Sequence, residues 1–389
     1  MLIRQLKRGL LAVALALGAA TGASAAGVSA TEIVLGTHLD LSGPVAAGMP
    51  SIRNGMQMRL DEANDAGGVN GRKFRIVVED NGSQPQMAVR AIDKLIRKDE
   101  VFAIVNPFGS GPNAAVVKRA VDEGVIYFAP WAASSIIRRT ANDSPLLFTV
   151  TPNYDTTMFK GVTWMLEQFK PRKVGFIYQE GPLGALMGAG VKKALEAKGM
   201  NYAAQAGYKA GDIDFSSQVA RMKAADVDLI VLATITRETI AVMAEVKKLG
   251  WNNVRVITGN PGRTSIVLQL GKDTVEGLYG VGTWKLYTPT VGPDNVKKWF
   301  ADYKKKFPHE PDENALLAYA YADIFVKAVQ AAGRDLTADK VLRALQTMSF
   351  EHPIFYDKQV FKGGHFEPEY TQIDQVKDGA WTALTKPMQ

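Results

Sequence analysis

The chain has 389 residues, of which 47% are hydrophobic and 22% are charged. This length suggests about two globular domains, and this composition excludes a largely disordered chain. The formal net charge is +7, and the chain has no cysteine, which excludes disulfide scaffolds, iron–sulfur clusters, cysteine-ligated zinc and thiol nucleophiles. Its four histidines are scattered and none lies four residues from another, so we expect neither a bound metal nor a cofactor.

The first 25 residues have the pattern of a secretory signal peptide. Three basic residues among the first eight precede the apolar run Leu10–Leu17, and small residues lead to the A-x-A sequence Ala23–Ala25. The alternative is a membrane anchor, which would need about 20 apolar residues, more than this run contains. We therefore predict cleavage near Ala26 and a soluble protein in the periplasm.

Removal of these three bases lowers the formal net charge from +7 to +4. The remaining lysines are spread along amphipathic segments such as 297–298 and 304–306, without the interleaved aromatic residues of a nucleic-acid-binding stripe. We expect solvated helix faces and no nucleic-acid partner.

The next part of the chain predicts strands that alternate with helices. The predicted strands are Glu32–Leu39, Phe74–Glu79, Val101–Val105 and Val125–Ala129, and the predicted helices are Ser51–Ala66, Met87–Arg97 and Asn113–Glu123. This alternation is typical of βαβ units, and the apolar, β-branched strands fit a parallel sheet that is covered on both faces.

A second alternating series begins after residues 147–149. Its predicted helices are Asp155–Phe169, Leu186–Lys198, Phe215–Ala224 and Thr239–Leu249, and its predicted strands are Lys173–Tyr178, Asn201–Tyr208, Leu229–Leu232 and Arg255–Thr258. Each series has roughly the length of one domain, which indicates two lobes of similar architecture.

The remaining segments are too few to form a third domain. They are a strand in Glu276–Gly282, helices near Asn295–Phe307, Asn314–Ala332 and Ala338–Thr347, and strand-like stretches at Phe355–Phe361 and Tyr370–Val376. Since a few strands alone are not independently stable, we expect the helices to return to the first lobe and the last strands to the second.

This arrangement requires three crossings between the lobes, near Val150, Tyr279 and Pro353. The predicted fold class is α/β, with two Rossmann-like, doubly wound lobes joined by a three-strand hinge. The predicted divisions are a signal peptide at 1–25, a first lobe from 26–149 plus 280–352, and a second lobe from 150–279 plus 353–389.

Ligands of open parallel sheets bind at the carboxyl ends of the strands, so the loops there are the candidate site. In the first series these loops contain Phe108, Gly109 and Ser110, and then Trp131, Ala132, Ala133 and Ser134. Exposed N–H groups at the helix start after the first loop would attract an anion, although simple helix capping is the alternative. Small residues in the second loop would let a ligand approach the backbone, and its hydroxyls could donate hydrogen bonds. Trp131 would offer the ligand a flat apolar surface, unless this tryptophan is a core residue.

The second series places Thr234, Thr236, Arg237 and Asn260 after its own strands. Thr236 is positioned to cap the following helix. Arg237 could bind an anion through two hydrogen bonds, or could be a solvated residue of the first helical turn.

The sequence contains no pattern for the common catalytic sites. Neither the G-x-S-x-G elbow nor the G-x-x-x-x-G-K-[ST] phosphate loop occurs. We therefore expect a protein that is not an enzyme. A secreted α/β enzyme remains an alternative, and it would need a nucleophile–base pair or a metal site.

Several segments in order resemble the branched-chain amino acid type of periplasmic solute-binding protein, the receptor subunit of an ABC importer. These segments are 41–44 (LSGP), 54–55 (NG), 62–72 (EANDAGGVNGR), 79–80 (ED) and 85–89 (PQMAV). The resemblance covers essentially the whole mature chain. It implies a type I, Venus flytrap fold, capture of a small-molecule solute, transient contact with the permease subunits, and, we expect, a monomer.

The resemblance also implies ligand contacts. The loops at Gly109–Ser110 and Ala132–Ser134 correspond to those that hold a ligand carboxylate, and we add Ser42 and Phe108 beside them. Asn260 stands in the region where such proteins place an acidic partner for the ligand ammonium, and Leu183 stands where an aromatic residue is common.

We therefore predict a small organic or aromatic carboxylate as the ligand, with an amino acid as the alternative. A sensory receptor module that uses the same clamshell is a second functional possibility.

Overall fold

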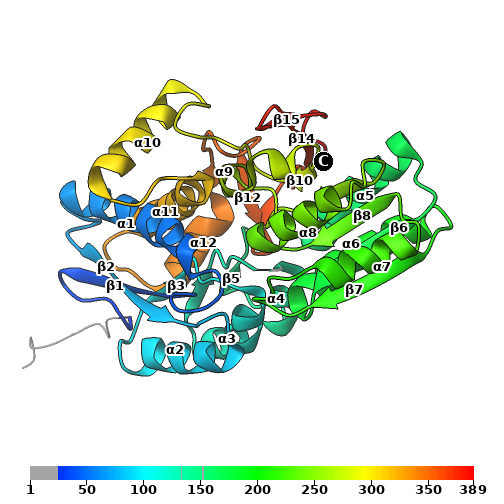
Figure 1. The fold of residues 1–389 in the computed structure, drawn as a ribbon. Coiled ribbons are helices and arrows are strands. Elements are labelled where there is room, and N and C mark those ends of the chain that lie inside the picture. Colours follow the sequence, from blue (N-terminus) through cyan, green and yellow to red (C-terminus); the bar gives the residue numbers. More distant parts are fainter. Residues whose placement is uncertain (1–24, 133, 151–152) are drawn as a thin grey trace, which may run out of the picture.

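The computed structural model describes residues 25–132, 134–150 and 153–389, and it has two α/β lobes (Figure 1). The first lobe contains a five-stranded parallel sheet in the order β2-β1-β3-β4-β5. Its strands are β1 (Glu32–Leu39), β2 (Lys73–Asp80), β3 (Ala103–Val105), β4 (Ile126–Phe128) and β5 (Leu147–Phe148). The predicted parallel sheet is thus confirmed.

Helices cover both faces of this sheet. They are α1 (Met49–Asp65), α2 (Pro85–Arg97), α3 (Ser110–Asp122), α4 (Ser134–Thr140), α10 (Asp294–Lys306), α11 (Glu313–Ala332) and α12 (Ala338–Thr347). Along β1, Val34 belongs to the core beneath α2 and α3, whereas Leu35 belongs to the core beneath α1 and α11. The alternation explains why the strands are apolar throughout, because both of their faces are buried.

Helix α11 is the most apolar long helix among the described residues. By length and composition it could span a membrane, but 67% of its most apolar window is buried inside the lobe, where it packs against α1 and α12. Its apolar character is therefore that of a core helix.

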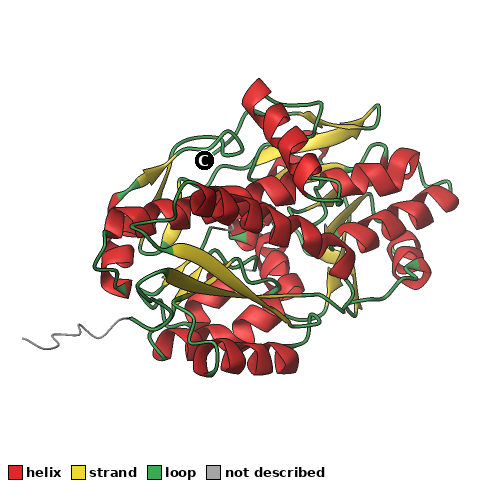
Figure 2. Ribbon diagram, turned by 90° about the vertical axis from the view of Figure 1, so that its left-hand side faces the viewer, coloured by secondary structure: helices red, strands yellow, loops and turns green. Residues whose placement is uncertain are grey.

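The second lobe contains a seven-stranded sheet in the order β15-β14-β10-β9-β8-β6-β7. Its strands are β6 (Val174–Gln179), β7 (Tyr202–Tyr208), β8 (Leu229–Ala233), β9 (Arg255–Thr258), β10 (Tyr279–Gly282), β14 (Gln372–Lys377) and β15 (Ala380–Ala383). Helices α5 (Tyr154–Phe169), α6 (Pro182–Glu196), α7 (Ser216–Ala224), α8 (Thr236–Lys248) and α9 (Ser265–Gly271) cover it. In Figure 2 the strands lie between the helices.

A small antiparallel sheet changes the expected path of the chain. It consists of β11 (Ser349–Phe350), β12 (Gln359–Lys362) and β13 (His365–Glu367). Phe361 and Phe366 pack in the first-lobe core against Phe128 and Phe148. The last crossing therefore follows Glu367 rather than Pro353, because these aromatic side chains hold the segment on the first lobe.

The second crossing also differs from its expected position near Tyr279. Strand β10 still pairs with β9 and β14 of the second lobe, and Trp284 is the next residue to enter the first-lobe core. The chain therefore crosses at residues 283–284. The first crossing, expected near Val150, lies next to residues outside the described ranges and stays a prediction.

Candidate functional site

The strand ends of the two lobes face each other. Pro44 lies in the loop after β1, and its carbonyl oxygen accepts a hydrogen bond of 3.1 Å from the Arg237 guanidinium at the start of α8. Helices α3 and α4 of the first lobe contact α6 of the second. The strand-end loops of the two lobes therefore approach each other at Pro44 and Arg237.

The structure brings the predicted first-lobe residues together. The Phe108 N–H donates to the His38 carbonyl, and the Gly109 N–H donates to the Trp131 carbonyl over 3.0 Å. Gly109 has φ +99°, and a Cβ there would lie 3.1 Å from the Pro112 ring, so glycine is required at this turn. Ser110 then begins α3, and Ala132 is buried beside Trp131.

The loop at Ala133 and Ser134 is only partly described. Ala133 lies outside the described residues, and Ser134 is described only as the first residue of α4. Their expected contacts with a ligand therefore remain predictions.

A chain of buried polar groups that sequence reasoning missed supports these loops. Asn81 Nδ2 donates to His38 Nδ1 over 2.9 Å, His38 Nε2 donates to the Tyr127 hydroxyl over 2.9 Å, and this hydroxyl donates to Asn113 Oδ1. Asn81 Nδ2 also donates to the Phe108 carbonyl, and Asn113 Nδ2 donates to the Gly109 carbonyl. The first-lobe loops are therefore fixed from beneath before any ligand binds.

Burial keeps this chain neutral. His38 is fully buried, and the loss of solvation lowers its pKa to about 3. The neutral imidazole accepts at one nitrogen and donates at the other, as this chain of hydrogen bonds requires.

The second-lobe residues are mostly bonded within the protein. Thr234 is buried, and its hydroxyl lies 2.6 Å from that of Thr239, which itself donates to the Ile235 carbonyl. The expected capping role of Thr236 is wrong: Ile235 is the N-cap of α8, no side chain caps this helix, and the Thr236 hydroxyl lies 3.4 Å from that of Thr264. Arg237 is exposed and bonds across the cleft mouth.

Asn260 fastens the second crossing. Its amide nitrogen donates to the Thr283 hydroxyl over 2.9 Å, and its amide oxygen accepts the Thr283 N–H over 3.1 Å. Both ends of this buried amide are thus occupied by the protein.

Two further predicted residues lie at the margins of the cleft. Leu183 lies in the first turn of α6 and packs against the second-lobe core. Ser42 is exposed, and its hydroxyl donates to Asp80 over 2.5 Å, so it helps to shape the loop after β1.

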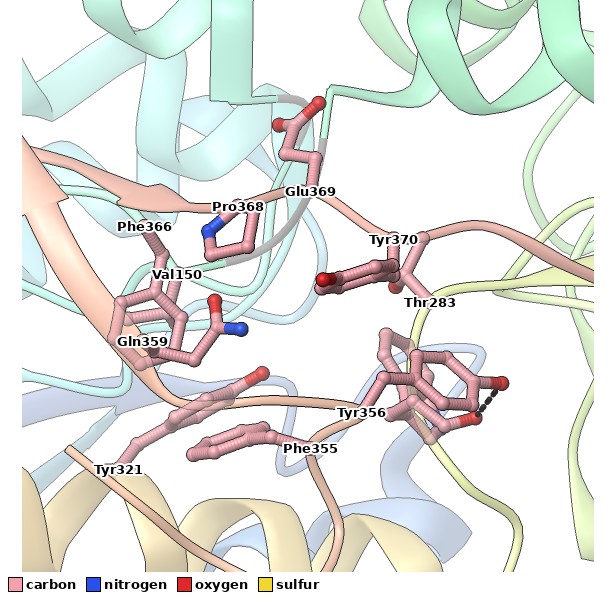
Figure 3. A pocket seen from close by; sticks show the side chains of 11 residues that line it. Val150, Thr283, Tyr321, Phe355, Tyr356, Gln359, Phe366, Pro368, Glu369 and Tyr370 are labelled. Carbon is pink, nitrogen blue, oxygen red and sulfur yellow. Dashed lines mark hydrogen bonds between the residues drawn. The ribbon is translucent and has the colours of Figure 1, made fainter. Parts of the chain in front are cut away.

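A pocket lies where the three crossings meet, and we call it the hinge pocket (Figure 3). Its cavity volume is about 30 Å³ in this conformation, and the empty space around that cavity continues into open solvent. Its lining residues are Val150, Thr283, Trp284, Tyr321, Phe355, Tyr356, Gln359, Phe366, Pro368, Glu369 and Tyr370. The walls are mainly aromatic, with few polar groups, which is the usual character of a small-molecule site.

Polar groups enter the hinge pocket at only a few points. In Figure 3 the Tyr321 hydroxyl and the Gln359 amide point towards its centre, whereas the Glu369 carboxylate points away. Glu369 accepts hydrogen bonds from the N–H and side-chain amide of Asn153 and contacts His365 Nε2. The Glu369 carboxylate therefore connects the segment at Asn153 to the segment at His365, rather than facing the pocket.

None of the predicted site residues lines the hinge pocket, but two touch its wall. The Trp131 ring packs edge-on against Tyr321, with centroids 5.8 Å apart, and Asn260 holds Thr283. The indole N–H groups of Trp131 and Trp284 are buried without a hydrogen-bond partner.

A buried ion pair lies behind this wall. Arg263 is 2% exposed and is bonded through Nε to Asp374 of β14, while its Nη1 donates to the Trp284 carbonyl over 3.1 Å. A Cβ at Gly282 would lie 2.1 Å from the same Nη1 atom, so this glycine makes room for the guanidinium. Among the described residues, no cluster of three or more acidic or histidine side chains could hold a metal ion.

Comparison with known proteins agrees with this architecture. A protein-family profile described as periplasmic binding protein matches residues 32–380. The chain is 26% identical over 306 residues to the Leu/Ile/Val-binding protein homolog 1 of Brucella suis biovar 1, which covers 78% of this chain and 79% of that protein.

Two further relatives match nearly the whole length. The leucine-, isoleucine-, valine-, threonine- and alanine-binding protein of Pseudomonas aeruginosa is 25% identical over 370 residues, covering 94% of this chain and 96% of the relative. The solved structure of a fatty acid ABC transporter substrate-binding protein from Thermomonospora curvata superposes with a TM-score of 0.82 at 25% identity, covering 94% of each chain.

Proposed function

Because this chain belongs to the periplasmic binding protein family and is a solute-binding component of an ABC importer of the branched-chain amino acid type, we propose that its solute is a small carboxylic acid with an apolar body. The observation that carries this proposal is the hinge pocket, whose aromatic walls lie between the lobes. An apolar body, aromatic or aliphatic, would remove this surface from water at about 25 cal/mol per Å².

The polar end of the solute would meet neutral donors. The Tyr321 hydroxyl and the Gln359 amide point into the pocket, and the Trp284 indole N–H lacks a partner. The Glu369 carboxylate, the one acidic side chain among the described lining residues, points away from the pocket and is bonded to Asn153. These groups favour an oxygen acceptor, such as a carboxylate, over an α-amino acid.

The named ligands of the relatives support the same chemistry. The Brucella relative is named for leucine, isoleucine and valine, the Pseudomonas relative also for threonine and alanine, and the Thermomonospora relative for fatty acids. Each of these ligands combines an apolar body with a carboxylate.

A thermal-shift screen of benzoate, hexanoate, leucine and glucose tests the proposal. Benzoate or hexanoate should stabilise the protein, by about 2.7 kcal/mol at a hundredfold excess over Kd. Stabilisation by leucine alone would overturn the preference for acids without an ammonium group, and stabilisation by none of the four would overturn the assignment of this solute class.

The substitution Tyr321→Phe locates the bound acid. Loss of a hydroxyl that faces the ligand should weaken binding by about 1–3 kcal/mol, measured by calorimetry with the acid found in the screen. Tyr319→Phe is the matched control, because Tyr319 is two residues away on α11 and donates to Glu62. Equal affinities for the two variants would show that the Tyr321 hydroxyl does not contact the solute.

We also propose that the protein is exported, that residues 1–25 are removed, and that the mature monomer docks transiently on permease subunits. The family and the amino-terminal pattern support this location. Mass spectrometry of the protein from a periplasmic fraction should give a chain that begins near Ala26, whereas an intact amino terminus in a membrane fraction would contradict export by cleavage.

A further inference from the structure

Glu313 and Ser265 form a buried contact between the two lobes. Glu313 is the first residue of α11 in the first lobe, and its side chain is fully buried. Its Oε1 accepts the Ser265 N–H over 2.9 Å, and its Oε2 is hydrogen-bonded to the Ser265 hydroxyl. Ser265 begins α9, which packs against α8 in the second lobe.

Both partners are held firmly by their own lobes. The neighbouring Asp312 caps α11 by accepting the Ala315 N–H, and its other oxygen accepts the Ser51 hydroxyl of α1 over 2.8 Å. On the opposite side, the Thr264 hydroxyl accepts the Val267 N–H and caps α9. Opening of the lobes would therefore separate Glu313 from Ser265 and would break both hydrogen bonds together.

This contact differs from the hydrogen bond between Arg237 and Pro44. Arg237 bonds to Pro44 at an exposed position, where water competes with the contact. The Glu313 carboxyl is screened from water, so its hydrogen bonds are stronger and leaving them unmade is more costly.

We propose that Glu313 is a positioning residue that holds the lobes closed, and that protonation of its carboxyl strengthens this hold and so makes solute capture tighter in acid. The inference rests on the proposed function only in assuming that the lobes open and close around a solute. It assigns to the pair a role in closure that is separate from contact with the solute.

The charges around this carboxyl come from several parts of the chain. Asp312 precedes it on α11, and Arg263, on the segment that leads into α9, carries the opposite charge and is paired with Asp374 of β14. His309, in the loop before α11, interacts with Asp312. Burial, and then the negative charge of Asp312, raise the pKa of Glu313 to about 7.

The sign of the pH effect follows from comparing the two forms. In the open form water reaches the carboxyl, whose ordinary pKa is 4.5. The closed form therefore binds more protons than the open form at intermediate pH, and closure becomes more favourable as the pH falls from about 7 towards 4.5. A protonated carboxyl can also donate to the Ser265 hydroxyl while its second oxygen still accepts the N–H.

Distance measurements on the ligand-free protein test this proposal. Because the chain has no cysteine, Gln86→Cys in the first lobe and Ile213→Cys in the second allow two spin labels to be attached at exposed sites. Double electron–electron resonance then reports the closed-to-open ratio. With these two pKa values, we expect this ratio to be about seventyfold higher near pH 5 than near pH 8.

The variants separate the proposed role from a merely structural one. Glu313→Gln carries an amide that accepts and donates like the protonated carboxyl, so it should stay closed at both pH values. Glu313→Ala should be open at both, and Ser265→Ala, which keeps the N–H, should fall between them. Glu167→Gln, an exposed substitution on α5, should behave like the parent protein.

Two results would overturn the proposal. One is a distance distribution of the parent protein that does not change between these pH values, and the other is a pH response that persists in Glu313→Gln. If Glu313→Ala fails to fold, Glu313→Gln and Ser265→Ala still decide the question. Since no solute is added, a failed search for the solute leaves this result unaffected, and the two proposals can fail separately.

Discussion

A chain of neutral hydrogen-bonding groups supports the strand-end loops of the first lobe, whereas a buried ion pair supports those of the second lobe. In the first lobe, His38, Tyr127 and Asn113 connect three parts of the chain without a formal charge. In the second lobe, Arg263 and Asp374 connect the segment after β9 to β14. Both arrangements are buried, so each holds its loops only while every member keeps its partner.

The two buried arrangements give the lobes separate structural roles. The neutral chain fixes the two loops that carry Phe108, Gly109 and Trp131, so the first lobe holds the loops at its strand ends rigidly in place. The ion pair fixes the crossing at Trp284 and the strand that returns from the hinge, so the second lobe holds the hinge geometry.

The largest effect is expected from Asp374→Ala. This substitution leaves the Arg263 charge buried and unpaired, which should cost about 3–5 kcal/mol of unfolding free energy. Urea denaturation measures the loss, and Asp273→Ala, at an exposed position in the same lobe, is the control. A loss below about 1 kcal/mol would show that the ion pair does not hold the second lobe.

Acid should weaken the first lobe through His38. Its pKa is about 3 in the folded protein against 6.5 in the unfolded chain, so the unfolded state takes up the proton first. Stability from this group is complete above pH 6.5 and should fall by about 1.4 kcal/mol per unit below it, down to pH 3. Denaturation of the parent protein and of His38→Gln across this range should give a shallower slope for the variant, and equal slopes would contradict the neutral assignment.

Tyr127→Phe should have the next largest effect. It removes the central hydroxyl and leaves His38 and Asn113 with unpaired polar atoms in the core, at a cost of about 1–3 kcal/mol. Tyr208→Phe is the matched control in the second lobe, because that buried hydroxyl donates to the Ala233 carbonyl over a long 3.4 Å and bonds no other side chain that we describe. Equal losses in thermal unfolding would mean that the chain has no special role.

Arg237→Ala should have the smallest effect. Its contact with Pro44 is exposed, so its loss should change the free energy of closure by less than about 1 kcal/mol. Small-angle scattering of the ligand-free protein would detect a larger change as an increased radius of gyration. Such an increase would show that the exposed Arg237–Pro44 contact is the main one that holds the lobes together.

The sequence was sufficient to predict the regular elements, because their patterns are local. Strands such as β1 and β9 have the predicted bounds, and α12 does as well. The short α4, α9 and β13 were missed, since each is too short to show a period. The last crossing was misplaced because Phe355 and Phe361 could pack on either sheet, and only the fold decides which one they join.

The sequence predicts only those parts of the site that follow from local patterns and from the topology of the sheet. The loops at Phe108–Ser110 and Trp131–Ala132 follow strands, so their proximity follows from the topology of a parallel sheet. The hinge pocket combines residues from Val150 to Tyr370, and no local pattern connects them. The position of Arg263 could not be predicted either, because its side chain occupies space that Gly282, on strand β10, leaves free.

The interleaved path of the chain has a consequence for biosynthesis. The first-lobe core needs Phe366, and the second-lobe sheet places β14 against β10, so each lobe waits for the final tenth of the polypeptide. A nascent chain on the ribosome therefore lacks both finished cores until translation is almost complete. Such a delay keeps the polypeptide extended for longer, which is the form that can thread through a narrow membrane channel.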